Sequence, residues 1–415
     1  MNFDLFTGKS LLLLGKTRVL EPSEFQTLLA LHSITMTQIL DDTTSLAIEG
    51  RMVNPLDQDL LDEIYTQKKI PIISIEAIEQ WLCSSIEPNR LLMSLKLSRN
   101  MQRLVAFIKN PYITNELFFK LLSLYDWHNE GLFDNDSNRD VTAALIGRFY
   151  LDLQRNHNVQ YAMSGLAHLV EQYGTGELIT AISQLQPIKK EIQQPNDASL
   201  NGVLDAIALH SDTPDTILKN LINTRSHLIA CREPLSLEQE LLARNDSTIN
   251  VILAQNITLS QSGAQHLEQS HPETIASFYP LDEVRFERLL HNHATSLASN
   301  TSLTPSMQTT LMEMKNEAIY TNLAQNKALL MHHLETLFAL QCCAVQLASN
   351  TSLCPQQLET LYQSSNTEIL KALASNTSTP VEILYQLSLD QRYERNVKTN
   401  PTFGHHIQTA NIGWN

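Results

Sequence analysis

The chain has 415 residues, of which 43% are hydrophobic and 18% charged, and its formal net charge is −15 at pH 7. This composition excludes a disordered polypeptide and gives enough material for two or three domains with buried cores. The negative charge, with no long run of Lys or Arg, argues against non-specific binding to nucleic acid or to an anionic membrane, because phosphate groups are bound by clustered cations. A local basic patch assembled by folding would still allow a nucleic-acid partner.

None of the five cysteines belongs to a C-x-x-C pair or a disulfide framework, which indicates a reducing compartment. The adjacent Cys342 and Cys343 are expected to point in different directions from a helix, as small core residues. The longest apolar run near the start, Leu11 to Leu14, is too short for a signal peptide or a membrane span. We therefore expect a soluble, cytoplasmic protein with no membrane partner.

Residues 1–86 have the pattern of a small α/β domain. Short apolar strands are predicted at 10–15, 33–39, 45–48 and 70–73, and amphipathic helices at 21–34, 56–65 and 74–83. This order, strand–helix–strand–strand–helix–strand–helix, predicts a mostly parallel sheet with helices on both sides. Ser74 is expected to cap the last of these helices.

The same segment resembles the BRCT domain, and the version it is most similar to is the one fused to bacterial DNA ligases. The resemblance rests on F-x-G-K at Phe6, Gly8 and Lys9, on a first strand that ends at Gly15, and on residues 69–82, which end in I-E-A-I-E-Q-W-L. It implies a BRCT-like module that offers a surface to a partner.

The residues that bind phosphate in that family are replaced here. Its phosphopeptide-binding members use a Ser or Thr just before the strand-ending Gly and a Lys in the second helix. Leu14 and about Leu61 take these places, and apolar side chains cannot bond a phosphate. Two interpretations of the next residues stay open: a weaker anion site or an ordinary solvated loop, formed by Lys16, Thr17 and Arg18.

Residues 87–100 are predicted to be a linker, and residues 101–200 a helical N-terminal cap of the repeats that follow. Helices are expected at 117–124, 141–153, 161–173 and 177–185, with a polar loop at 126–140 and a flexible segment at 187–199. Such a cap would shield the apolar end of the first repeat from water.

Residues 201–403 repeat a short template: an apolar residue, a small residue, any residue, then Asn. Copies begin, at spacings of 22 to 26 residues, at Ile207, Ile229, Leu253, Ile275, Leu297, Leu323, Leu347, Leu373 and Val397. A period in the twenties is typical of stacked repeats, in which each unit buries its apolar face against the next.

Each unit is predicted to hold a helix that follows a Pro and a second short apolar piece that runs into the next Asn. Behind Pro380, for example, Ile383, Leu384 and Leu387 share one helix face. Three Thr residues directly precede a Pro and are expected to cap those helices: Thr213, Thr304 and Thr379.

The template Asn is retained in six copies: Asn256, Asn300, Asn326, Asn350, Asn376 and Asn400. One interpretation is structural, because Asn tolerates a helix end and can bond loop backbone with its amide. The other is a polar row on a concave face that contacts a ligand.

The repeats resemble the leucine-rich repeat variant family, most clearly in A-L-A-S-N-T-S-T-P-V-E-I-L-Y-Q-L at 372–387 and N-V-K-T-N-P-T-F at 396–403. The resemblance implies an all-α right-handed solenoid that pairs a short 3₁₀-type helix with an α-helix. Some members carry an N-terminal iron–sulfur cluster bound by clustered cysteines, which this chain lacks. Residues 404–415 lose the pattern and are predicted to form a C-terminal tail.

The chain contains no G-x-G-x-x-G, P-loop, G-x-S-x-G or H-E-x-x-H motif. Its histidine pairs at 291/293, 332/333 and 405/406 lack the i, i+4 spacing of zinc ligands. We therefore expect no catalytic, cofactor-binding or metal-binding residues.

These observations favour a non-enzymatic protein–protein interaction scaffold or adaptor that binds a protein or peptide through a solenoid concave face and the BRCT-like module. The alternative is a genome-maintenance factor that contacts DNA or DNA-repair proteins through that module. An enzyme is a third hypothesis, and self-association through exposed repeat ends is left open.

Overall fold

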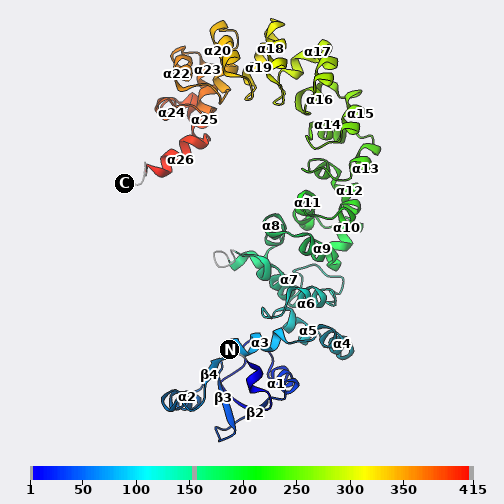
Figure 1. Ribbon diagram of the computed structural model, residues 1–415, viewed down its shortest axis with the longest axis vertical. Helices are drawn as coiled ribbons and strands as arrows, with labels where there is room; N and C mark the ends of the chain where they lie inside the picture. Colours follow the sequence, from blue (N-terminus) through cyan, green and yellow to red (C-terminus); the bar gives the residue numbers. More distant parts are fainter. Residues whose placement is uncertain (1–2, 152–156, 411–415) are drawn as a thin grey trace. The chain divides into compact units, whose positions relative to one another are not determined.

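The computed structural model describes residues 3–151 and 157–410. The chain divides into two compact units, Met1–Leu221 and Ile222–Asn415. The first unit contains a small α/β domain followed by helices, and the second unit is helical throughout its described residues (Figure 1).

The α/β domain is built on a parallel sheet of four strands in the order β2-β1-β3-β4. The strands are β1 (Ser10–Leu14), β2 (Thr35–Thr37), β3 (Thr44–Glu49) and β4 (Ile72–Ser74). A 3₁₀ turn (Phe3–Phe6) precedes β1, and the helices are α1 (Pro22–Leu31), α2 (Pro55–Gln67) and α3 (Ile75–Ser84). Figure 1 shows α1 and α2 on opposite faces of the sheet. The predicted order of elements and the parallel sheet are confirmed.

The local sequence explains where these helices begin. Pro55 and Pro22 stand at first helical positions, where a missing N–H costs nothing. Asn54 caps α2 by accepting from the N–H of Asp57, and Ser74 caps α3 by accepting from the N–H of Ala77, as predicted. Side chains of β1, β3 and α2 share one core, formed by Leu12, Leu14, Ala47, Leu61 and Ile64.

The rest of the first unit is helical: α4 (Pro88–Ser98), α5 (Met101–Ile108), α6 (Asn115–Leu122), α7 (Asp136–Phe149), α8 (Met163–Tyr173), α9 (Gly176–Gln184), α10 (Gln186–Gln193) and α11 (Asn201–Leu209). Short 3₁₀ turns occur at His157–Tyr161 and Ala198–Leu200. Helix α12 (Asp215–Ala230) spans the division between the units and is interrupted at Arg225.

Three segments differ from the expectations for this region. Helix α4 fills most of the predicted linker 87–100, because Leu91 and Leu95, four residues apart, are buried. The segment 187–199 is not flexible throughout, because α10 buries Ile188 and Glu191. The polar loop 126–140 is shorter than expected, since Asn135 caps α7. Helix α7 ends at Phe149, and residues 152 and 153 of the predicted helix lie outside the described residues.

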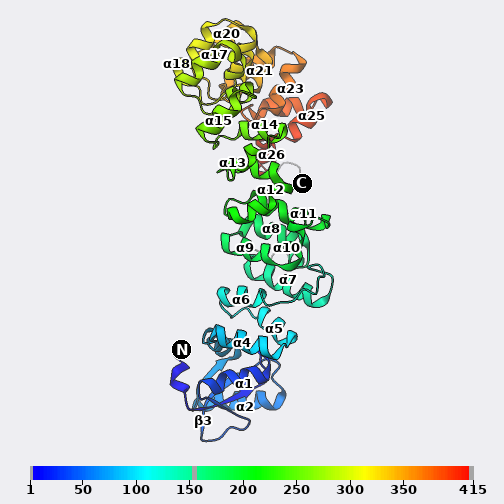
Figure 2. The same ribbon diagram turned by 90° about the vertical axis from the view of Figure 1, so that its right-hand side faces the viewer.

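Two contacts attach the α/β domain to the helices that follow it. The guanidinium of Arg103, on α5, donates from Nε and Nη2 to the two carboxylate oxygens of Glu24, on α1, at 2.7 Å each. Asn110, after α5, is 2% exposed and donates from Nδ2 to the sulfur of Cys83, on α3, at 3.2 Å. Both views show α4 and α5 beside the α/β domain (Figures 1 and 2).

The helices of the second unit alternate between two rows. The outer row contains α13 (Glu238–Ala243), α15 (Gln261–Glu268), the first part of α17 (Glu283–Leu297, interrupted at His293), α18 (Pro305–Glu313), α20 (Met331–Leu340), α22 (Pro355–Gln363), α24 (Val381–Ser388) and α26 (Pro401–Thr409). The inner row contains α14 (Ser247–Gln255), α16 (Pro272–Phe278), the end of α17, α19 (Glu317–Gln325), α21 (Ala344–Ser349), α23 (Thr367–Ser375) and α25 (Gln391–Lys398). Figure 1 shows the inner row on the inside of the curve that this unit follows.

Successive helix pairs share one core that contains buried residues from Ala276 to Val397. Leu297, Leu347 and Leu373 hold equivalent places in it, each near the end of an inner-row helix and at most 1% exposed. The sequence period therefore corresponds to a repeated pair of helices. Part of the predicted tail is helical, because α26 runs to Thr409, whereas residues 411–415 lie outside the described residues.

The predicted Thr caps are confirmed at one position of three. Thr304 accepts from the N–H of Met307 and caps α18. Thr213 and Thr379 are buried and instead donate to the backbone carbonyls of Ile207 and Leu373, at 2.6 and 2.7 Å. Because the loop folds back onto the preceding helix, these two hydroxyls bind backbone carbonyls near the end of that helix.

Candidate functional site

The loop after β1, where the sequence left a weak anion site open, already holds an internal anion. The carboxylate of Glu79, on α3, is fully buried. It accepts hydrogen bonds from the backbone N–H groups of Arg18, Val19 and Leu20, at 3.0 to 3.2 Å. A buried carboxylate needs such donors to offset its lost hydration, and several N–H groups together supply them. These three amides are therefore engaged within the chain.

Other groups of the same loop are also paired within the chain. The guanidinium of Arg18 pairs with the carboxylate of Glu76. Lys16 forms a backbone bridge with Arg51, in which each N–H donates to the other's carbonyl at 2.7 Å. The side chains of Lys16 and Arg18 are exposed and that of Thr17 is partly buried. Among these three residues, only Lys16 carries an exposed cation that forms no ion pair within the described part of the chain.

A second carboxylate lies at the carboxyl end of β1. Gly15 donates its N–H to Oδ2 of Asp57 at 3.2 Å, and Asn54 donates to the same oxygen at 2.8 Å. Leu14 and Leu61, at the positions that bind phosphate in the resembled family, are 3% and 0% exposed. The sequence could not reveal Glu79 or Asp57 as internal ligands, because both look like ordinary acidic residues of helix surfaces.

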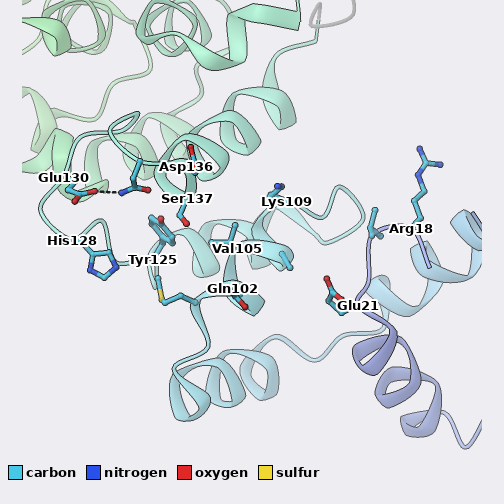
Figure 3. A pocket seen from close by; sticks show the side chains of 14 residues that line it. Arg18, Glu21, Gln102, Val105, Lys109, Tyr125, His128, Glu130, Asp136 and Ser137 are labelled. Atoms are coloured by element: carbon cyan, nitrogen blue, oxygen red, sulfur yellow. Dashed lines mark hydrogen bonds between the residues drawn. The ribbon is translucent and has the colours of Figure 1, made fainter. Parts of the chain in front are cut away.

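A groove of about 830 Å³ lies within the first unit, between this loop, α5 and the segment before α7 (Figure 3). Met101, Val105 and Ala106 on one face of α5 form a half-exposed apolar floor. The imidazole of His128 and charged side chains of both signs surround it: Arg18, Glu21, Lys109, Glu130 and Asp136. The sequence analysis did not predict this groove, because its walls come from three separate segments.

Several polar groups of the groove are paired, either with one another or with side chains just outside it. The ammonium of Lys109 contacts the Asp140 carboxylate at 2.6 Å, and Asn135 donates to Glu130. The Tyr125 hydroxyl lies 2.8 Å from Oδ1 of Asn138, and burial raises the pKa of this phenol. It therefore stays protonated near neutral pH and acts as a hydrogen-bond donor. The groove thus offers both polar and apolar contacts, and its charged groups are of both signs rather than of one.

The six template asparagines lie at the ends of inner-row helices and are buried, at 1–5% exposed. Asn350 shows the common geometry. Its Nδ2 donates to the carbonyls of Ala324 and Asn326, in the preceding repeat, at 2.7 and 3.2 Å. Its Oδ1 accepts from the N–H of Ser352, two residues later, at 2.8 Å.

The same bonds recur along the second unit. Asn326 donates to the backbone oxygen of Asn300, Asn376 to that of Asn350, and Asn400 to that of Asn376. Asn256 and Asn300 each donate to two carbonyls of the preceding repeat. We call these six residues the asparagine ladder. The hydrogen bonds of the ladder favour the structural interpretation of these asparagines. A row that contacts a ligand would need exposed side-chain amides, and the six amides are buried.

The residue directly before each ladder asparagine is exposed and carries a neutral polar side chain. These residues form what we call the polar stripe of the inner row: Gln255, Ser299, Gln325, Ser349, Ser375 and Thr399. Because the core packs on the opposite side of these helices, the stripe faces away from the outer row. The exposed polar row therefore lies one position before the template Asn, the residue that the sequence analysis considered for ligand contact.

Among the residues that the structure describes, no cluster of three or more His, Cys, Asp or Glu side chains could hold a metal ion. Within residues 3–151 and 157–410, no helix combines the length and apolar character needed to cross a membrane. Cys342 and Cys343 were expected to point apart, but their sulfur atoms lie 3.9 Å apart, with Cys342 exposed and Cys343 buried. Comparisons with protein-family models, with curated proteins and with solved structures gave no match.

Proposed function

We propose that the protein is a non-enzymatic scaffold that binds other polypeptides, and that the second unit is a right-handed α-solenoid of the leucine-rich repeat variant type. The observation that carries this proposal is the pairing of a buried asparagine with an exposed neutral polar neighbour, repeated in six copies along the inner row. Buried asparagines fix the spacing of the repeats, so the exposed residues recur at a regular interval. Stacked-repeat proteins bind partners along such faces.

The chemistry of the polar stripe indicates the kind of ligand. Ser, Thr and Gln side chains both donate and accept hydrogen bonds without imposing a charge. An extended polypeptide offers unpaired backbone N–H and carbonyl groups at a regular spacing. The stripe therefore suits an extended segment of a partner protein.

We extend the proposal to residues 1–86 as a BRCT-like module. The parallel sheet with α1 and α2 on opposite faces supports this assignment. Because Glu79 and Asp57 occupy backbone donors of the loop after β1, we propose that the module contacts protein surfaces rather than phosphate. The same carboxylates weigh against the alternative of DNA contact through this loop.

Substitutions that fill the stripe test the proposal. Tagged full-length protein carrying Ser299→Glu, Ser349→Glu and Ser375→Glu should lose the partners that the unmodified chain captures from native lysate. A control carrying Gln356→Glu, Thr360→Glu and Gln363→Glu adds the same charge to exposed positions of α22, in the outer row, and should keep them. Quantitative mass spectrometry compares the captured proteins. Identical sets from both variants would count against the inner row as the binding face.

A further inference from the structure

The inner row changes character at its last two helices. The residue two positions before the repeated apolar residue is Val251, Glu273, Thr295, Thr321 and Val345 in the earlier helices, and then Lys371 and Arg395. Both of these cations are exposed, and neither belongs to an ion pair in the part of the chain that the structure describes. Their neighbours on α25 are paired: Arg392 with Asp390 and Lys398 with Glu394, at 2.6 Å each.

The two cations lie on neighbouring helices and on the same face. Asn396, on α25, donates to the Ser375 hydroxyl, on α23, at 2.8 Å. Lys371 lies one helical turn before Ser375, and Arg395 is adjacent to Asn396. Packed helices are about 8–10 Å apart, so the two cations form a short basic site at one end of the polar stripe.

We propose that Lys371 and Arg395 bind acidic side chains of an extended polypeptide whose remaining length lies along the polar stripe. This inference rests on the proposed function, and it adds the chemical class and the orientation of the ligand. In the polyproline II form of an extended chain, which advances about 3.1 Å per residue with three residues per turn, carboxylates three residues apart lie on one side and match the spacing of the two cations. A ligand with acidic residues at one end would then bind in one direction.

The two cations do not contribute equally. Glu368 is three residues before Lys371 and is the carboxylate closest to it along α23. Its charge offsets part of the Lys371 charge, because residues three apart on a helix are neighbours. Arg395 also presents a planar guanidinium that can bind a carboxylate through two hydrogen bonds. Loss of Arg395 should therefore weaken binding more than loss of Lys371.

A polypeptide fits this site better than a nucleic acid does. Non-specific nucleic-acid binding depends on many cations along a backbone and on aromatic side chains that stack on bases. The stripe next to the two cations consists of Ser, Thr and Gln, and the chain as a whole carries a net charge of −15.

Fluorescence anisotropy of a labelled peptide, titrated with the full-length protein, tests the inference. The ionic strength is kept near the physiological value, because salt screens the long-range repulsion between the net negative charge of the protein and an acidic peptide. The probe is a fluorescein-labelled peptide of about twelve residues that repeats Ser-Ser-Asp, and the matched control peptide repeats Ser-Ser-Asn. We expect the acidic peptide to bind about tenfold more tightly. The double variant Lys371→Glu, Arg395→Glu should lose about this factor. Lys189→Glu with Lys327→Glu, which changes exposed lysines elsewhere by the same charge, should stay within about twofold of the unmodified protein.

Further variants and probes separate the outcomes. Arg395→Gln and Lys371→Gln, which introduce no new charge, should each weaken binding of the acidic peptide, the first more than the second. Equal affinity for both peptides, unchanged in the variants, would overturn the inference and leave the polar stripe as a binding face. No measurable binding of either peptide would contradict both proposals. Binding of a fluorescein-labelled oligothymidylate, lost in the double variant and without peptide binding, would overturn the assignment in favour of nucleic acid.

Discussion

Asn376 donates a hydrogen bond from its side-chain Nδ2 to the backbone carbonyl oxygen of Asn350 at 3.1 Å, and Asn400 makes the same bond to Asn376 at 3.0 Å. Asn350 and Asn376 thus each link the repeat before them, through the side-chain amide, to the repeat after them, through the backbone carbonyl. Since both groups are buried, breaking one link leaves polar atoms without partners in two neighbouring repeats. The ladder therefore couples the stability of adjacent repeats.

Asn350→Ala should destabilise the protein by about 2 kcal/mol, because it removes both amide donors and leaves buried carbonyls with fewer partners. Urea denaturation measures the change in the free energy of unfolding. The adjacent Ser349→Ala is the control, since this exposed side chain should contribute less than about 0.5 kcal/mol. Equal denaturation midpoints for the two variants would show that the ladder does not stabilise the stack.

Glu79→Gln should destabilise the first unit by about 2 kcal/mol, because an uncharged amide oxygen accepts more weakly from the N–H groups of Arg18, Val19 and Leu20. The new NH₂ group would also lie near those donors. Glu76→Gln, at a half-exposed position of the same helix, is the matched control and should change stability by less than about 1 kcal/mol. Thermal and urea unfolding followed by circular dichroism compare the two. A Glu79→Gln protein as stable as its control would exclude a structural role for this carboxylate.

His333 should make the second unit less stable in mild acid. Burial, and to a lesser degree the neighbouring His332, lower the pKa of His333 below its usual 6.5. The unfolded chain then binds a proton at a higher pH than the folded chain does, so stability is fully present above about pH 6.5 and declines as the pH falls below that value. Urea midpoints measured between pH 7 and pH 5 should fall more for the unmodified protein than for His333→Gln. Parallel pH curves for the two proteins would be inconsistent with this effect.

The cysteines should differ sharply in their rates of alkylation. Burial raises the pKa of Cys83 to about 11 and that of Cys343 to about 12. Because the thiolate is the reactive form, iodoacetamide at mildly alkaline pH should modify the exposed Cys231 and Cys342 at least about tenfold faster than the buried Cys83 and Cys343. Peptide mass spectrometry over a time course gives the rate at each position. In denaturant all five should react at similar rates, and a Cys343 that reacts as fast as Cys231 in the folded protein would show that it is not buried.

The sequence predicted those features that depend on neighbouring residues. Strand and helix order in residues 1–86 follows from apolar spacing and from caps such as Ser74, which act within one turn. The repeat period follows from the template around Leu297, Leu347 and Leu373, because equivalent sequences adopt equivalent local structure. Helix α4 was missed, since its burial of Leu91 and Leu95 depends on packing rather than on a strong local pattern.

What the sequence determined by itself was the order of elements in the first domain and a period of 22 to 26 residues in the repeats, because both are set by interactions over a few residues. Only the tertiary structure decided which polar groups are buried and which remain exposed. It buried the template asparagines and exposed the residues before them, and it placed Glu79 against the amides of a loop about sixty residues away in the chain. The physical reason is that a polar group binds whichever donor or acceptor packing brings nearest, and that partner is set by the fold rather than by the local sequence.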